Sequence, residues 1–414
     1  MKTVLFVATS SNVNSGGGRT RMVDMAREAQ EHGFRVYILC FVYATQWLSN
    51  PIRLWHGRAQ LATESVCPVF YLPIFPFGRW ICITKINDWL ASTLLAWLAR
   101  WLHAALLIGL GTKAGYLSTQ ARKVYSSLKV VSDIQGAISQ EYRYEHGDSA
   151  SHAFIDYFEH KEATTLSDSD GLIFVSRAMQ QYYEEYHSCS FLSAYILPCV
   201  ARTNFSLDWG QRQVLRSEYG LLERFIICYV GAAESYQLPD MMCRLFKQIK
   251  AEFPQAFFLI YSFQVGAFEA SLRQEGISAS DYKITSVSHD QIFSHLQIGD
   301  VGLLLRDSSL VNRVASPLKF GEYCTSGLPV ITTPYVGDYS LLVKKNHSAL
   351  GLSHLFHECP PIYYPSCKMC CDNVNSMHCV VRVLRMNISL GQVIVTLFLL
   401  FLICFSHESP HHLA

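Results

Sequence analysis

Short apolar runs alternate with amphipathic segments along most of this chain, and polar, often glycine-containing loops separate them. An apolar, β-branched run bounded by turn residues is typical of a buried parallel strand, and apolar residues three and four positions apart are typical of a helix. The predicted strands of the first half are 3–8, 35–40, 104–108, 129–133, 172–175 and 194–198. Those of the second half are 225–230, 256–261, 282–286, 301–305 and 328–332.

This alternation predicts an α/β protein with two doubly wound domains. The first domain is predicted to comprise residues 1–200. Residues 201–222 are polar with few apolar anchors, and we predict a linker there. The second domain is predicted to comprise residues 223–352, and residues 41–85 are expected to be irregular because they are rich in proline and aromatic residues.

The segment 311–340 has the most informative local pattern. Ser316 is a good N-cap and Pro317 suits the first helical position, so a helix is expected from Pro317 to Thr325. Gly327 is expected to end this helix. The buried strand 328–332 follows it.

Lys319 is unusual because it lies in the first turn of that helix, where the helix dipole disfavours a cation. A helix N-terminus binds anions, so a lysine there is expected if a phosphate also binds. The alternative is a solvated lysine that pairs with Glu322 one turn later.

Polar and glycine residues follow the predicted strands, where open parallel sheets bind their ligands. They are Gly16, Gly17 and Gly18 after the first strand, then Gln135, Gly231, Arg306, Lys319 and Glu322. Two sheets with facing carboxyl ends are expected to enclose one cleft. Arg306, Arg313 and Lys319 are three cations within 14 residues, and such a cluster suits a diphosphate.

Composition narrows the classes of protein. Half of the 414 residues are hydrophobic and 16% are charged, as in a globular protein, and the formal net charge of +1 argues against nucleic-acid binding. The N-terminal apolar run is too short for a signal peptide, so a first strand and a cytoplasmic location are expected.

Residues 86–110 predict a strongly apolar helix followed by a strand. Asp88 and Arg100 limit its uncharged run to 11 residues, which is too short to span a bilayer. We predict a helix that lies in the core or lines a groove. The alternative is a membrane-surface face formed by Trp89, Trp97 and Trp101.

Six sequence blocks, in this order along the chain, resemble those of GT-B glycosyltransferases of the group 1, or family 4, type. They are SGGGRTRMVDMAREAQEHGFRV (15–36), VVSDIQGAISQE (130–141), IFVSRAMQQYY (173–183), ILPCVARTNF (196–205), YVGAAESYQ (229–237) and LLLRDSSLVNRVASPLKFGEYCTSGLPVI (303–331). The resemblance covers about residues 1–352.

The resemblance implies two Rossmann-like domains and transfer of a sugar from a nucleoside-diphosphate sugar to a glycan or lipid-linked acceptor. It implies retention of configuration and neither metal nor cofactor, because cationic side chains and a helix N-terminus neutralise the leaving diphosphate. Glu322 would bind the donor ribose, Gly16–Gly18 and Gly231 would shape the donor site, and Gln135 would lie near the sugar. Arg306, Arg313 and Lys319 are the implied pyrophosphate ligands.

The chain departs from the family pattern at three places. Val314 stands where many relatives have an acidic residue, and Glu234 and Tyr236 stand where basic residues often hold the diphosphate. Gln135 stands where relatives often have a histidine, and a glutamine can hydrogen-bond a sugar hydroxyl but cannot exchange its proton usefully.

The tail 353–414 does not match the family. It contains six cysteines and the uncharged, mostly apolar segment 388–405. One interpretation is a zinc site formed by Cys367, Cys370, Cys371 and Cys379, and another is a C-terminal membrane anchor. A third is a frameshifted C-terminus and hence an inactive or membrane-tethered product. A nucleotide-sugar epimerase with the same fold is a further alternative.

Overall fold

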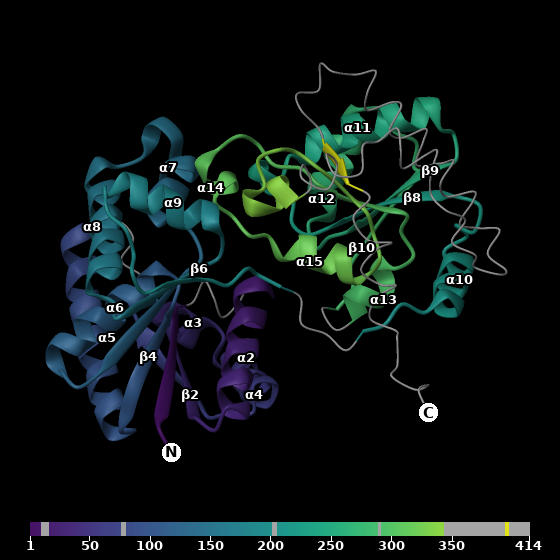
Figure 1. The fold of residues 1–414 in the computed structure, drawn as a ribbon. Helices are drawn as coiled ribbons and strands as arrows, with labels where there is room; N and C mark the ends of the chain where they lie inside the picture. Colours follow the sequence, from purple (N-terminus) through teal and green to yellow (C-terminus); the bar gives the residue numbers. More distant parts are fainter. Residues whose placement is uncertain (10–15, 76–79, 201–204, 289–290, 343–393, 397–414) are drawn as a thin grey trace, which may run out of the picture. The chain divides into compact units, whose positions relative to one another are not determined.

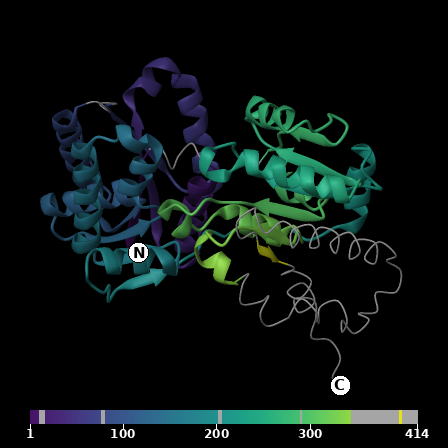
Figure 2. The same cartoon turned by 90° about the horizontal axis from the view of Figure 1, so that it is seen from above.

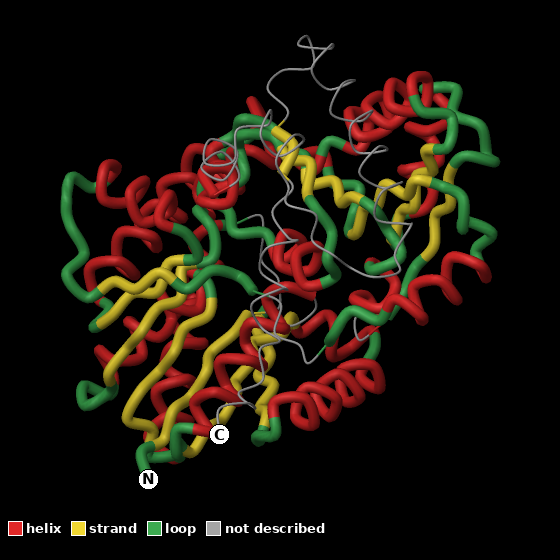
Figure 3. The backbone as a smooth tube through the Cα atoms, turned by 45° about the vertical axis from the view of Figure 1, so that its right-hand side comes forward, coloured by secondary structure: helices red, strands yellow, loops and turns green. Residues whose placement is uncertain are grey.

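The computed structural model describes residues 1–9, 16–75, 80–200, 205–288, 291–342 and 394–396. The chain forms two compact units (Figure 1). Unit 1 comprises Met1–Cys199 and Ser309–Ser316, and unit 2 comprises Val200–Ser308 and Pro317–Ala414. Each unit contains a mainly parallel sheet with helices on its faces (Figure 3), which confirms the predicted fold class.

Unit 1 is built on a seven-stranded parallel sheet of order β3-β2-β1-β4-β5-β6-β7. Its strands are β1 (Thr3–Thr9), β2 (Arg35–Tyr43), β3 (Val69–Ile74), β4 (Ala104–Leu110), β5 (Lys129–Ile134), β6 (Gly171–Phe174) and β7 (Ala194–Ile196). Alternate residues of β1 enter two hydrophobic clusters, Phe6 one and Leu5 the other. Both faces of this sheet are therefore buried, as the continuous apolar runs predicted.

Helices cover the two faces of this sheet. They are α2 (Gly16–Glu31), α3 (Ala44–Ser49), α4 (Pro51–Ser65), α5 (Ile81–Trp101), α6 (Thr112–Val124), α7 (Ile138–His146), α8 (His152–Asp168), α9 (Arg177–Tyr186), α14 (Leu310–Arg313) and the 3-10 turn Gly147–Ser149. Met22 of α2 and Leu61 of α4 pack in the cluster of Phe6, whereas Leu95 of α5 and Ala114 of α6 pack in that of Leu5. Helices α4 and α5 therefore lie on opposite faces of the sheet.

Two predictions for unit 1 were wrong. The segment 41–85 is not irregular, because α3, α4 and β3 form within it. Its prolines fit these elements: Pro51 takes the first position of α4, and Pro73 lies in β3, an edge strand. The polar segment after the first strand, residues 9–18, was expected to be a loop, but Gly16–Gly18 form the first turn of α2.

Unit 2 is built on a six-stranded sheet of order β10-β9-β8-β11-β12-β13. Its strands are β8 (Phe225–Val230), β9 (Ala256–Tyr261), β10 (Tyr282–Thr285), β11 (Val301–Leu304), β12 (Val330–Thr332) and β13 (Ile394–Thr396). Its helices are α10 (Trp209–Glu218), α11 (Pro239–Glu252), α12 (Val265–Gln274), α13 (Ile292–Leu296), α15 (Leu318–Thr325) and the 3-10 turn Ser235–Gln237.

Strand β13, yellow in Figure 2, is antiparallel to β12 and belongs to the predicted apolar segment 388–405. Three residues of that segment thus form an edge strand. The rest of the segment, and the cysteines of the proposed zinc site, lie outside the described residues.

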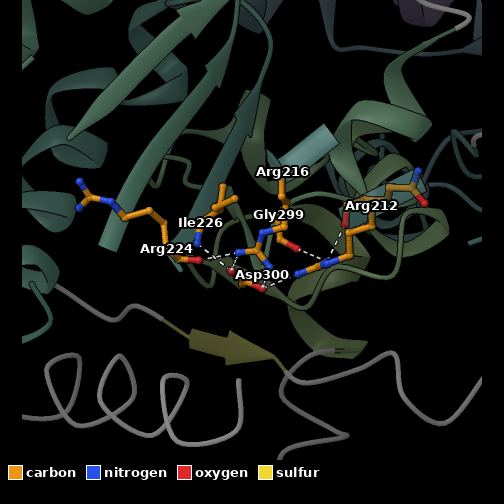
Figure 4. Close-up of polar contacts among 7 residues, drawn as sticks. Arg212, Arg216, Arg224, Ile226, Gly299 and Asp300 are labelled. Carbon is orange, nitrogen blue, oxygen red and sulfur yellow. Dashed lines mark hydrogen bonds and ion pairs between the residues drawn. The ribbon is translucent and has the colours of Figure 1, made fainter. Parts of the chain in front are cut away.

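The predicted linker 201–222 contains helix α10, whose two buried side chains are arginines, while its Leu215 packs against the hydrophobic core of unit 2. Arg212 and Arg216 of α10 are buried and donate to the carboxylate of Asp300 over 2.5 and 2.8 Å (Figure 4). The same carboxylate accepts from the backbone nitrogen of Ile226 over 2.8 Å. The scarcity of apolar residues led the sequence prediction to miss this helix.

Helix α5, predicted to lie in the core or to line a groove, has only one side in the core. Trp89, Trp97 and Trp101 are 64%, 68% and 69% exposed, whereas Ala91 and Leu95 on the other side of the helix are buried. Among the residues that the structure describes, none of the helices is long and apolar enough to cross a bilayer.

Candidate functional site

Three neighbouring strands of unit 2 end side by side, and polar residues follow each of them. Gly231 follows β8, Arg306 follows β11 and Thr333 follows β12. The backbone of Arg306 is fixed by Thr333, whose hydroxyl accepts from Arg306 N over 3.0 Å and donates to Arg306 O over 2.7 Å. The guanidinium of Arg306, a residue only 7% exposed, lies 5.0 Å from the ring centroid of Tyr236.

Tyr323 fixes helix α15 against these strand ends. Its hydroxyl donates to Leu303 O over 3.0 Å and accepts from Val230 N over 3.1 Å. Gly302 makes the approach of the helix feasible, because a Cβ atom there would lie 2.7 Å from the Tyr323 ring. The second turn of α15 is therefore held near the carboxyl ends of β8 and β11.

The helix has nearly the predicted limits. It spans Leu318–Thr325, and Gly327 follows it with a φ of +72°, as predicted for the residue that ends the helix. The predicted N-cap was wrong: Pro317 occupies that position, and the Ser316 hydroxyl accepts from Cys199 N over 2.9 Å instead.

Lys319 points from the first turn of α15 toward β8 and the loop after it. Its Nζ donates to the Tyr229 hydroxyl over 2.9 Å and to Gln237 Oε1, and it lies 4.6 Å from the Tyr229 ring centroid. Gly231 has a φ of +134°, and a Cβ atom there would lie 2.4 Å from Lys319 Nζ. The structure thus brings together the predicted residues Lys319 and Gly231.

The electrostatics of this cluster are unfavourable to its cations. Burial and the nearby Arg306 charge lower the pKa of Lys319 well below its ordinary value, and buried Glu322 opposes this shift. Burial also lowers the pKa of Arg306. An anion at this position would relieve both effects, because an opposite charge favours the protonated form of each group. We call Arg306, Lys319, Glu322 and Gly231 the carboxyl-end cluster.

Gln135 in unit 1 is held by a buried ion pair. Its Nε2 donates to Asp133 Oδ2 over 2.7 Å, and Arg21 of α2 donates to the same carboxylate with Nε over 2.8 Å and Nη2 over 2.7 Å. Burial would lower the pKa of Arg21, but the hydrogen bond and charge of Asp133 outweigh burial and raise it. Since an ionised carboxylate only accepts, the Gln135 amide is oriented with Oε1 away from Asp133.

The remaining predicted residues also lie in unit 1. Gly17 has no atom within 4 Å of where a Cβ would stand, so the start of α2 is open at that position. Arg313 is exposed on α14. Val314 is 2% exposed and packs with Ile134 and Met179, so this departure from the family pattern is a core residue of unit 1.

Sequence reasoning missed Tyr229, Gln237 and Arg21. Tyr229 lies within an apolar strand and resembles any other core residue there. Arg21 carried a usable signal, because it precedes Met22, which begins a run of apolar residues at helical spacing (Met22, Met25, Ala26 and Ala29). A buried partner for it would have been expected.

Groups of three or more histidine, cysteine or acidic side chains that could hold a metal are not found within the described ranges. The prediction that no metal or cofactor takes part stays a prediction.

No protein-family model and no curated protein matches the chain. Solved structures do match it. HepE from Anabaena, in complex with UDP-glucose, has a TM-score of 0.61 at 12% identity over 94% of this chain and 98% of its own. A glycosyltransferase from Rickettsia africae has a TM-score of 0.57 at 12% identity over 94% and 97%. WaaG, a glycosyltransferase involved in lipopolysaccharide biosynthesis, has a TM-score of 0.56 at 14% identity over 82% and 84%. The chain therefore has the GT-B fold of these glycosyltransferase structures.

Proposed function

We propose that this protein is a glycosyltransferase that moves a hexose-type sugar from a nucleoside-diphosphate sugar to a glycan or lipid-linked acceptor. The observation that carries the proposal is the carboxyl-end cluster. It gathers two cations, Lys319 and Arg306, where parallel α/β sheets bind ligands, and it does so in the GT-B fold. HepE, which shares this fold, was solved with UDP-glucose.

The chemistry asked of the cluster is stabilisation of a leaving diphosphate. When the bond between the sugar and the diphosphate breaks, negative charge develops on the phosphate oxygens. Lys319 and Arg306 would stabilise that charge from a partly dehydrated site, where a charge–charge interaction is stronger than in water. This role requires no metal, and it agrees with the metal-independent, retaining mechanism of the resembled family.

Lys319 has to change partners to bind a phosphate. In the structure its ammonium donates to two neutral oxygens, of Tyr229 and Gln237. A phosphate oxygen is a stronger acceptor than either, because it carries a negative charge that attracts the ammonium in addition to accepting its hydrogen bond. Glu322, one turn later on the same helix face, is proposed to accept from the donor ribose hydroxyls.

Gln135 is proposed to act on the sugar through its Oε1. Asp133 accepts from Gln135 Nε2, so Oε1 is the atom oriented to accept from a sugar hydroxyl. Gly16–Gly18 and Arg313 are retained as donor-site residues on the strength of the family resemblance.

Isothermal titration calorimetry with UDP and with GDP tests the site. We expect Lys319→Ala and Glu322→Ala each to weaken the affinity of the preferred nucleotide by about tenfold or more, since each removes the charged member of a hydrogen bond to the nucleotide. Lys247→Ala is the matched control. The Lys247 side chain is 57% exposed on α11, and its ammonium makes a surface ion pair of 3.6 Å with Glu275, so its removal should not affect nucleotide binding. Unchanged affinity in both site variants would exclude this site assignment.

Product analysis separates transfer from epimerisation. Incubation of the full chain with UDP-glucose and no acceptor should leave the sugar configuration unchanged. A converted donor under these conditions would identify an epimerase instead.

A further inference from the structure

Helix α5 exposes a continuous apolar strip. We call the tryptophan face the residues Ile86, Trp89, Leu90, Leu94, Trp97 and Trp101, which are between 40% and 69% exposed. With about 3.6 residues per turn, these six positions fall within an arc of about 140° on the helix. Ala91, Leu95 and Ala99 lie on the other side and pack in the core of unit 1.

This strip is unusual for a helix that covers a sheet. The outward side of such a helix is ordinarily polar, and single exposed apolar residues are common. A contiguous exposed apolar strip that contains three tryptophans is uncommon. It indicates a surface that a membrane or another molecule covers.

The charged residues of α5 indicate which kind of partner covers the tryptophan face. The only acidic residue of α5 is Asp88, whose carboxylate is 2.8 Å from the buried ammonium of Lys161 on α8. Lys85 and Arg100, near the two ends of the helix, are exposed. The outward side of α5 therefore combines tryptophan, aliphatic side chains and positive charge.

That combination matches an anionic bilayer surface. Tryptophan favours the membrane interface because its ring is apolar and its N–H remains hydrogen-bonded there. Lysine and arginine are attracted to anionic headgroups. The uncharged run of 11 residues in α5 is too short to span the bilayer. A helix with these properties lies in the plane of the interface.

We propose that the tryptophan face of α5 binds the surface of an anionic phospholipid bilayer, with the helix axis parallel to the membrane. The proposal does not rest on the glycosyltransferase activity, because it concerns a different surface and requires no donor.

The test is co-sedimentation of the full chain with vesicles of phosphatidylglycerol and phosphatidylcholine in equal parts. Wild type should bind, and the double variant Trp97→Ala/Trp101→Ala should lose about tenfold or more in vesicle affinity, because it removes the two most exposed rings. The matched control is Trp55→Ala. Trp55 is 60% exposed on α4, on the opposite face of the sheet, so this variant should bind vesicles like wild type.

Two further measurements test membrane binding without relying only on the vesicle affinity of the double variant. Brominated lipids should quench the tryptophan fluorescence of wild type more than that of the double variant. Lys85→Gln/Arg100→Gln should bind phosphatidylglycerol vesicles several-fold more weakly and with less dependence on salt.

The double variant retains the segment 388–405, so equal vesicle binding by wild type and double variant would overturn the proposal. So would a wild-type dimer that the double variant abolishes, accompanied by no vesicle binding, since that result assigns the face to a second copy of the chain.

Discussion

At the amino ends of β8 and β11, Arg212 and Arg216 donate to one shared carboxylate, that of Asp300. At the carboxyl ends of the same strands, Lys319 and Arg306 lie close enough for the charge of Arg306 to lower the pKa of Lys319. Both regions bury two cations in unit 2. Among the contacts of the described residues, a carboxylate that both cations bind directly is found in the first region. The first arrangement holds α10 to the sheet, and the second is the arrangement expected of the proposed diphosphate site.

The difference shows how a binding site can be distinguished from a structural ion pair within one sheet. A structural pair is complementary in the free protein, so removal of one partner leaves a buried charge uncompensated. A site for an anion is complementary only when the anion is bound. Substitutions at the amino ends should therefore affect the free energy of unfolding, and substitutions at the carboxyl ends should affect nucleotide affinity.

The largest expected effect is on stability, at the amino ends. Asp300→Ala removes the acceptor for two buried guanidinium groups and for the backbone nitrogen of Ile226. We expect the free energy of unfolding to fall by about 3–5 kcal/mol, measured by urea denaturation. Glu269→Ala is the control: its partner Arg273 is 76% exposed, and the loss should be below about 0.5 kcal/mol. Equal losses would show that the network does not anchor α10.

The next effect should appear at Gly231, where the backbone allows Lys319 to approach. A Cβ atom would stand 2.4 Å from Lys319 Nζ, and the φ of +134° is strained for alanine. Gly231→Ala should lower the free energy of unfolding by about 1–3 kcal/mol and also weaken UDP binding, because Lys319 has to move. In Gly266→Ala the new methyl group meets no atom within 4 Å, and helix α12 should become slightly more stable.

Lys319 itself should matter little for stability. Lys319→Met removes a cation whose burial and repulsion by Arg306 are unfavourable, but it also removes donors to Tyr229 and Gln237. We expect the free energy of unfolding to change by less than about 1 kcal/mol, while UDP binding falls by about tenfold or more. A loss of stability as large as that of Asp300→Ala would contradict the comparison, because Lys319 would then be structural.

The elements of this comparison were unequally predictable from the sequence. Strand–helix alternation and the rule that ligands bind at strand carboxyl ends placed Lys319, Glu322 and Gly231 together. Gly231 follows a recognisable strand, and Lys319 and Glu322 lie on the helix that follows another. The contacts of Lys319 with Tyr229 and Gln237 join residues 90 and 82 positions apart, and no local pattern specifies them.

Long-range ion pairs and surface exposure were the parts that local patterns could not supply. Arg21 and Asp133 are 112 positions apart, and α10 is anchored through residues 84 to 88 positions away. The apolar pattern of α5 left a core or groove-lining helix and a membrane-surface helix as alternatives, because hydrophobicity alone cannot distinguish a core-facing tryptophan from an exposed one. The charged residues of α5 supplied an additional signal: its two cations are exposed, whereas its one acidic residue, Asp88, is paired with Lys161.

The smallest expected effect is a proton linked to nucleotide binding. Burial and Arg306 lower the pKa of Lys319 in the free protein, and a bound diphosphate should raise it again, so the complex binds more protons between the lowered pKa and the ordinary lysine pKa. UDP affinity should therefore fall as pH rises through that window. Calorimetry in two buffers of different ionisation enthalpy should show proton uptake on binding within that window. The measurements are made above the phosphate pKa of about 6, so that UDP itself contributes no proton. Lys319→Arg, which stays charged, should take up none. Equal proton uptake by wild type and Lys319→Arg would show that the titrating group is not Lys319. The proposed difference between the two ends of the sheet would then lose its support.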